Sequence, residues 1–125
     1  MANINVKIDT VGAVDTNTQL RTATYSEGSG NPGWSGVAAN GDVDLSKNGA
    51  QPDVKIIWAL PDGYLFNATN PFTTNPVSAD FSVESGAGTN TLTVRDTNND
   101  VSITDYEYTL HLSDGTKIDP RVINH

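Results

Sequence analysis

The sequence predicts an all-β fold, a two-layer antiparallel β-sandwich of immunoglobulin-like type, with a jelly roll or an open barrel as alternatives. Apolar and polar residues alternate in several short runs, which is the period of a half-buried strand. Turn-forming runs rich in Gly, Asn, Asp and Pro separate them at intervals too short for a helix of normal length. The 125 residues fit one domain with its own core, so residues 1–125 are predicted to form a single domain.

The first predicted strand is INVKI, and three further runs show the same alternation of apolar residues. The apolar positions expected to face the core are Ile4, Val6 and Ile8; Val54, Ile56, Trp58 and Leu60; Phe81 and Val83; and Leu92 and Val94. Between the second and third sets lies NATNPFTTNPVS, the longest segment without a strand pattern. We expect it to form an irregular crossover loop between the two sheets.

The clearest predicted hairpin spans residues 106–123. In YEYTLHL the tyrosines and leucines fall on one face, while Glu107, Thr109 and His111 fall on the other. SDGT then supplies an Asp-Gly turn, and TKIDPRVI returns as the second strand. His111 is therefore predicted to lie on the polar face, and Pro120 to mark an edge or a bulge.

The runs TLTVRD, ITDYEYTLHL and TKIDPRVIN resemble strands E, F and G of an immunoglobulin-like or fibronectin-like sandwich. The resemblance gives Trp58 the place of a buried strand C tryptophan, and Tyr106 or Tyr108 the place of a tyrosine whose hydroxyl bonds across a corner. The start NINVKIDT and the pair Asp119-Pro120 also resemble small uncharacterised bacterial proteins of the DP-EP type. That second resemblance implies no known activity and no functional residue.

Composition limits the classes of function. Fifteen acidic and seven basic residues give a formal net charge of −8, which disfavours nucleic acid and anionic membrane surfaces as partners. The chain has no cysteine, which excludes disulfides, thiol nucleophiles and cysteine metal sites. We find no signal peptide and no membrane-spanning segment in the sequence, so the predicted location is cytoplasmic by default.

The strongest pattern for a metal site is RDTNNDVSITD. Asp96, Asn98 and Asp100 alternate oxygen-bearing side chains as calcium-binding loops do. An EF-hand loop would also need glycine at its sixth position, where Val101 stands, although Glu107 fills the twelfth. The favoured interpretation is that these residues build a turn. No cofactor is therefore predicted, and calcium remains the alternative.

No pattern in the chain predicts catalysis. The two histidines, His111 and His125, are not accompanied by a Gly-x-Ser-x-Gly motif, and no pair among the three glutamates is singled out. We expect the protein not to be an enzyme, with no catalytic residue. Three aromatic residues in or near loops, Tyr25, Trp34 and Phe72, are the candidate ligand-binding residues, and core packing is the competing interpretation for such side chains.

Three functions stay open. The leading hypothesis is a non-enzymatic module that binds a protein or carbohydrate partner through loops or a sheet edge, as in strand addition. The second is a structural subunit of a homo-oligomer, which a concentration-dependent mass in solution would reveal. The third is a hydrolase with a hidden carboxylate pair, which would require a pocket lined by two close carboxyls.

Overall fold

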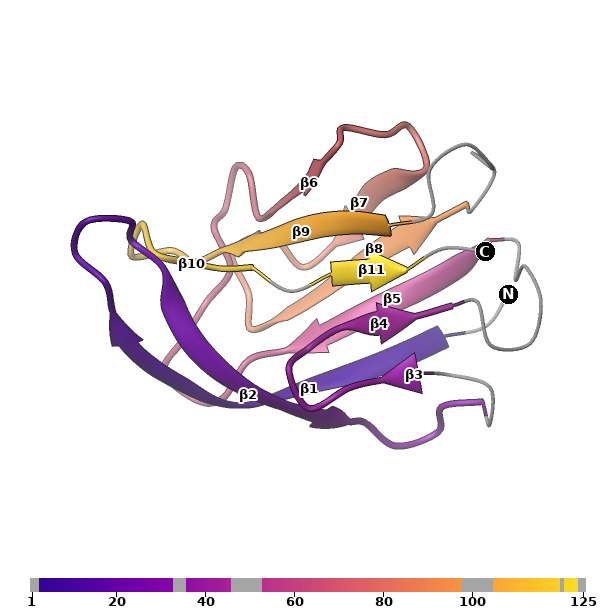
Figure 1. Cartoon of the computed structure of the whole chain (residues 1–125), viewed down its shortest axis with the longest axis horizontal. Helices are drawn as coiled ribbons and strands as arrows, with labels where there is room; N and C mark the ends of the chain where they lie inside the picture. Colours follow the sequence, from indigo (N-terminus) through magenta and orange to yellow (C-terminus); the bar gives the residue numbers. More distant parts are fainter. Residues whose placement is uncertain (1–2, 33–35, 46–52, 98–104, 120, 124–125) are drawn as a thin grey trace.

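The computed structural model describes residues 3–32, 36–45, 53–97, 105–119 and 121–123. These residues form eleven strands in two sheets that face each other across a shared core (Figure 1). The all-β class predicted from the sequence is therefore confirmed. Within these ranges there is no helix with the length and apolar character needed to cross a membrane.

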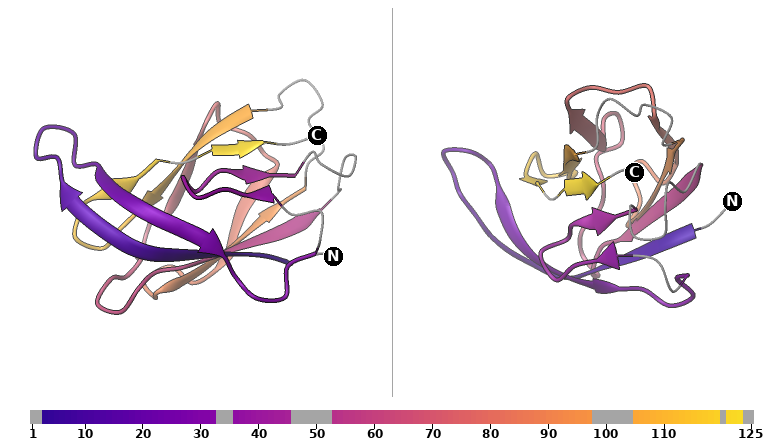
Figure 2. Two further views of the ribbon diagram at one scale, coloured as in Figure 1. Left: turned by 60° about the horizontal axis from the view of Figure 1, so that its bottom comes forward. Right: turned by 45° about the vertical axis from the view of Figure 1, so that its right-hand side comes forward.

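The first sheet has the order β2-β1-β5-β8-β7. Its strands are β1 (Asn3–Val14), β2 (Arg21–Glu27), β5 (Val54–Ala59), β7 (Phe81–Ser85) and β8 (Thr91–Asp96). The long hairpin of β1 and β2 extends beyond the rest of the sandwich (Figure 2). In this sheet β1 pairs with β5 in parallel, and the other neighbours are antiparallel.

The second sheet is centred on β9 (Asp105–His111). One side of β9 pairs with β10 (Lys117–Ile118) and then β11 (Arg121–Ile123), and β6 (Phe72–Asn75) also pairs antiparallel with β9. The sheet continues from β11 to β4 (Val43–Asp44) and β3 (Gly36–Val37). Here β11 and β4 are parallel.

The prediction that the sandwich is antiparallel throughout is wrong, because β1–β5 and β11–β4 are parallel pairs. The error has a physical reason. Side chains alternate between the two faces of a strand in the same way whichever direction its neighbour runs. The alternation in the sequence therefore predicts strands and their buried faces, but it carries no information on pairing direction.

The predicted core positions are buried with two exceptions on β7. The set from Ile4 to Ile8, the set from Val54 to Leu60, and the pair Leu92 and Val94 all lie in the core. On β7, Phe81 is only partly buried and Val83 is 40% exposed. Both depart from the expectation because β7 is the last strand of its sheet and has a neighbour on one side only.

Trp58 and Tyr108 connect the two sheets through the core. The Trp58 Nε1–H donates to the Tyr108 hydroxyl at 3.0 Å, and that hydroxyl donates to the Gly41 carbonyl at 2.9 Å. The two rings lie with centroids 4.9 Å apart. Trp58 is buried as expected, but its strand β5 pairs with β1 and β8 in the first sheet, opposite β9.

Two local predictions need correction or refinement. The hairpin at residues 106–123 forms, but its returning strand is divided into β10 and β11, which pair with different parts of β9. The segment NATNPFTTNPVS is not wholly irregular, because β6 lies within it. The chain thus passes from β5 in the first sheet to β6 in the second and back to β7 in the first.

The two long sides of the sandwich differ. On the side of β2 and β10, Leu20 forms a parallel bridge with Lys117, and the Lys117 N–H donates to the Gln19 carbonyl at 3.0 Å. On the other side, β7 and β6 are the last strands of their sheets, and no ladder between them is present in the described part of the chain. This open edge contains the candidate site.

Candidate binding groove at the open edge

The aromatic residues predicted as ligand-binding do not form a loop surface. Tyr25 lies on β2 with 7% exposure, and Phe72 lies on β6 with 9% exposure, so both belong to the core. Trp34 falls outside the described residues. Tyr25 precedes the turn-rich run SEGSGNPG and lies within β2, so its side chain packs into the core as the competing interpretation expected.

The backbone at Gly41 explains why Tyr25 is covered. Gly41 has a φ of +90° and lies directly on the Tyr25 ring, where an added Cβ would come within 2.6 Å of a ring carbon. Only glycine combines that conformation with so close an approach. Burial, then the negative charges of Asp119 and Asp42, raise the pKa of the Tyr25 hydroxyl far above its usual range.

The proposed calcium residues are only partly described. Asp96 is the last residue of β8, and its side chain is buried on the same face as Leu92 and Val94. Asn98 and Asp100 lie outside the described residues. Among the residues that are described, no group of three His, Cys, Asp or Glu side chains could hold a metal ion. The calcium hypothesis therefore stays a prediction.

An apolar groove runs between β6 and β7 at the open edge. Its volume is about 210 Å³, and it is lined by Phe72, Thr73, Thr74, Val77, Ser78 and Phe81. The Phe72 and Phe81 rings are 5.7 Å apart between centroids, and the Phe81 ring meets the edge of Tyr106 at 4.9 Å. These contacts form an aromatic floor where the two sheets meet.

The free edge of β6 presents backbone groups to this groove. The His111 N–H donates to the Pro71 carbonyl at 2.9 Å. Since alternate residues of an antiparallel strand bond to the same neighbour, Thr73 and Asn75 direct their backbone groups toward β9. Phe72 and Thr74 direct theirs outward, and within the described ranges no hydrogen bond reaches those groups.

The same reasoning applies to β7. The Thr97 N–H donates to the Asp80 carbonyl at 2.9 Å. By the same alternation, Ser82 directs its backbone groups toward β8, whereas Val83 directs its backbone groups outward. Farther along β7 the register shifts between Val83 and Ser85, and Glu84 pairs with Lys55 at 2.8 Å. A bulge and a charged residue are devices that discourage strand pairing. The edge of β6 is therefore the more accessible of the two.

Exposed apolar side chains also gather at this edge. In the part of the chain that the structure describes, three large apolar side chains are exposed, and two of them are Val77 at 90% and Val83 at 40%. Val77 lines the groove, and Val83 lies on the neighbouring strand β7. The third, Leu65, lies outside the groove lining. Sequence reasoning named one residue of this groove, Phe72, but missed the strand edge beside it, because NPFTTNP has two prolines and no alternating pattern.

His111 holds β6 to β9 at the outer surface. Its Nε2 lies 2.9 Å from the Thr73 hydroxyl oxygen. Burial is the main cause that lowers the pKa of His111, the positive charge of Lys117 lowers it further, and Asp119 opposes the change. A lowered pKa and a hydroxyl partner fit a cross-strand contact, as the sequence predicted for this polar-face residue.

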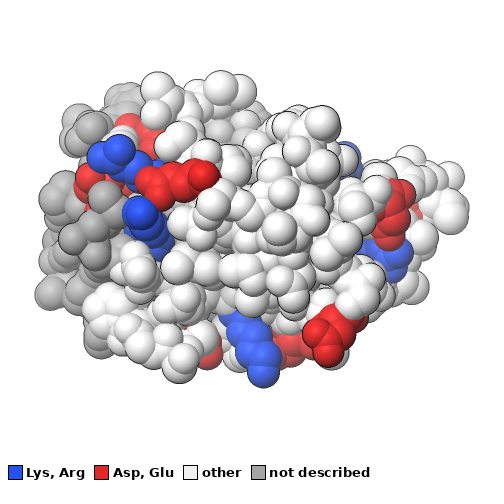
Figure 3. Space-filling view, turned by 180° about the vertical axis from the view of Figure 1, so that it is seen from behind, with Lys and Arg blue, Asp and Glu red and all other residues white. Residues whose placement is uncertain are grey.

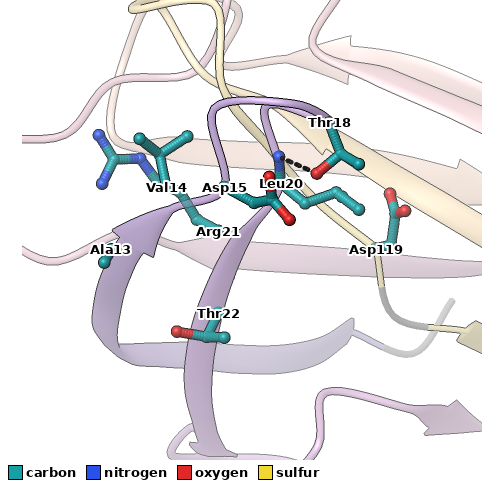
Figure 4. Close-up of a pocket in the computed structure, with 8 residues that line it drawn as sticks. All are labelled: Ala13, Val14, Asp15, Thr18, Leu20, Arg21, Thr22 and Asp119. Atoms are coloured by element: carbon teal, nitrogen blue, oxygen red, sulfur yellow. Dashed lines mark hydrogen bonds between the residues drawn. The ribbon is translucent and has the colours of Figure 1, made fainter.

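A second, larger recess lies under the β1–β2 hairpin, with a volume of about 550 Å³. Figure 4 shows Asp15 and Asp119 on opposite sides of the Leu20 side chain, with the Arg21 guanidinium directed away from both. Asp15 accepts the Asn17 N–H at 2.9 Å, and Asp119 accepts the Thr109 hydroxyl at 2.8 Å. Both carboxylates therefore already have donors within the protein.

Arg21 fixes the hairpin that covers this recess. Its guanidinium donates to the Thr116 hydroxyl at 2.8 Å, to the Gly12 carbonyl at 2.8 Å and to the Asp114 carboxylate at 3.0 Å. Hydrogen bonds from Thr116, followed by the contribution of Arg21, hold the pKa of Asp114 below its usual range. These contacts account for Arg21 and Asp114 as structural residues.

The outer face of the first sheet has little net charge. Figure 3 shows basic and acidic side chains side by side near its margins and a broad uncharged centre. Arg95 forms a two-pronged contact with Asp53 at 2.6 and 2.7 Å, and Lys55 pairs with Glu84. The basic groups on this face are thus matched by neighbouring carboxylates.

Comparison with known proteins adds no family. No protein-family model matches the sequence, and no curated protein matches it significantly.

Proposed function

We propose that this protein is a non-enzymatic interaction module that binds an extended segment of a partner protein by strand addition to β6. One observation carries the proposal. The backbone N–H and C=O groups of Phe72 and Thr74 point outward from the sheet edge, beside an apolar groove. In strand addition, main-chain hydrogen bonds supply affinity and pockets for alternate side chains supply specificity. The open edge offers both.

The energetics of the groove suit a reversible partner. Each main-chain hydrogen bond that replaces a bond to water contributes about 0.5–1.5 kcal/mol, and a buried Val-sized side chain contributes about 1.5–3 kcal/mol. Four outward backbone groups and a groove of about 210 Å³ can therefore offset part of the entropy lost on association. A short strand with one or two apolar anchors matches these dimensions.

A protein partner is better supported than a carbohydrate. Sugar-binding surfaces commonly use exposed aromatic rings as stacking platforms. Tyr25 and Phe72 are buried, and within the described ranges the exposed large apolar side chains are aliphatic. Aliphatic side chains beside outward backbone groups favour a peptide.

The test is binding of displayed random peptides, followed by calorimetry of the selected sequences. Thr74→Pro removes the outward N–H but no bond to β9, because the Thr74 amide points away from that strand. Thr74→Val keeps the N–H and the extended backbone. We expect Thr74→Pro to weaken binding at least tenfold and Thr74→Val to preserve it. Equal binding to both variants would refute strand addition at β6.

We also propose that the scaffold is of immunoglobulin-like type. In support, β8 lies in one sheet while β9, β10 and β11 lie in the other, as strands E, F and G would. Trp58 departs from this type, because its strand β5 pairs with β8 in the first sheet, whereas strand C of an immunoglobulin-like sandwich shares a sheet with F and G. A solved relative with the same strand order would test this proposal.

A further inference from the structure

We infer that the segment bound by β6 carries a basic residue followed by two apolar residues at alternate positions, in the order basic–apolar–any–apolar. This inference rests on the proposed function and specifies its partner. It follows from the register of β6, the shape of the groove and the charge around it.

The two apolar positions follow from the faces of β6. Phe72 pairs with Leu110 and Thr74 pairs with Tyr108, and both partners on β9 are fully buried. Phe72 and Thr74 therefore point to the inner face of the sheet. Residues directly opposite one another on neighbouring strands share a face. The two partner residues opposite Thr74 and Phe72 must then point inward, into the groove.

The groove selects the chemistry of those two side chains. It is bounded by the Phe72 and Phe81 rings and by Val77, which is 90% exposed. A charged side chain placed there would lose hydration without gaining a matched group. Aliphatic side chains would instead cover apolar surface, and the residue between them would face outward beside Thr73.

The direction of the partner follows from the strand pairing. Antiparallel pairs are slightly more stable per residue than parallel pairs, and β6 pairs antiparallel with β9. An antiparallel segment that places its apolar residues opposite Thr74 and Phe72 has its preceding residue opposite Asn75. That preceding residue lies on the outer face of the sheet.

Charge selects the residue opposite Asn75. On β9 the neighbour of Asn75 is Glu107, which is exposed on the same outer face. The partner residue would lie two strand spacings from Glu107, about 9.6 Å between backbones, which a Lys or Arg and a Glu side chain can span over the shorter Asn75. The chain's net charge of −8 adds a long-range preference for a basic segment.

Three capped peptides test the inference: GSKVTVSG, GSKTVTSG and GSEVTVSG. The second exchanges the apolar and polar positions, and the third reverses the charge. We expect the first to bind about tenfold more tightly than the second, because both of its valines enter the groove, whereas the one Val of GSKTVTSG lies opposite Thr73 and faces outward in the same register. We expect a preference of about threefold or more over the third at low salt, decreasing as salt is added.

Variants of the protein assign the effects to residues. Glu107→Gln should reduce the preference for GSKVTVSG over GSEVTVSG, whereas the matched control Asp62→Asn, on an exposed turn, should leave it unchanged. If all three peptides bind equally and Thr74→Pro abolishes binding, strand addition stands and the inferred motif is wrong. If none of the three binds but displayed random peptides bind in a way that Thr74→Pro weakens, the motif is wrong and strand addition stands; if displayed peptides do not bind either, both proposals are overturned.

Discussion

At the scale of single residues, the Tyr108 hydroxyl should stabilise the fold by joining the two sheets. It accepts from Trp58 Nε1 at 3.0 Å and donates to the Gly41 carbonyl at 2.9 Å, and all three groups lie in the interior or on its boundary. Tyr108→Phe leaves an indole N–H and a carbonyl without this partner. We expect the free energy of unfolding to fall by about 1–3 kcal/mol, as for other buried polar groups left unsatisfied.

Urea unfolding with an unchanged m-value measures this loss. The matched control is Tyr64→Phe, because Tyr64 is only partly buried and its ring contacts the Arg21 guanidinium at 5.7 Å. The control should change stability by less than about 0.5 kcal/mol. Equal effects of the two substitutions would show that the Tyr108 hydroxyl has no special role.

His111 should make stability depend on pH. Burial and then Lys117 lower its pKa in the folded state below the ordinary 6.5. Between the folded-state pKa and 6.5 the unfolded chain binds more protons, so stability rises with pH across this window. The loss of folding stability caused by the lowered pKa of His111 is absent above that window. It is fully present below the folded-state pKa. We therefore expect the wild type to lose stability as pH falls below 6.5.

The comparison that isolates His111 is urea unfolding of the wild type and His111→Gln at pH values above and below the window. The variant should lose less stability on acidification than the wild type does. His125→Gln keeps His111 and should follow the wild type. If the free energy of unfolding depended on pH in the same way for the wild type and His111→Gln, His111 would not be the cause of the loss of stability.

At the scale of elements, the outward backbone groups of β6 and β7 should be visible in amide hydrogen exchange. Thr73 and Ser82 direct their N–H groups to β9 and β8, whereas Thr74 and Val83 direct theirs outward. We expect the Thr73 and Ser82 amides to exchange at least about tenfold more slowly than those of Thr74 and Val83, after correction for sequence effects. NMR exchange rates measure this directly.

The Thr73–Thr74 comparison is matched in residue type and strand. Slow exchange at Thr74 in the free protein would mean that its N–H already has a partner, and strand addition at β6 would lose its main support. The measurement needs no ligand, so it can be made before the partner is known.

Individual strands were predictable where apolar residues alternate over four or more positions. The runs at Ile4–Ile8 and Val54–Leu60 and the faces of residues 106–112 were predicted correctly, because alternation is a local property. The strand β6 was not, because its four residues lie between Pro71 and Pro76 and gain their pairing from β9, far along the chain. Its outward backbone groups depend on that register, which no local pattern encodes.

At the scale of the whole molecule, the all-β class and the two layers follow from composition and turn spacing, but the pairing directions do not. Parallel neighbours such as β1 and β5 are separated by about forty residues of chain, and the sequence does not show which distant strands meet. The burial of the candidate ligand residues Tyr25 and Phe72 was unpredictable for the same reason. Their burial depends on segments from elsewhere, Gly41 over Tyr25 and Trp58 beside Phe72.

The net charge of the molecule predicts its state of association. Each chain carries a formal charge of −8, so two copies repel at low ionic strength, while the exposed Val77 and Val83 favour contact once charges are screened. We expect sedimentation velocity to give the mass of one chain at low salt and some dimer at high salt. Val77→Ser should reduce that dimer, and Leu65→Ser, also at an exposed position, should not. A stable dimer at low salt that Val77→Ser does not weaken would instead favour the hypothesis that the protein is a structural subunit of a homo-oligomer. Its interface would then lie on another surface.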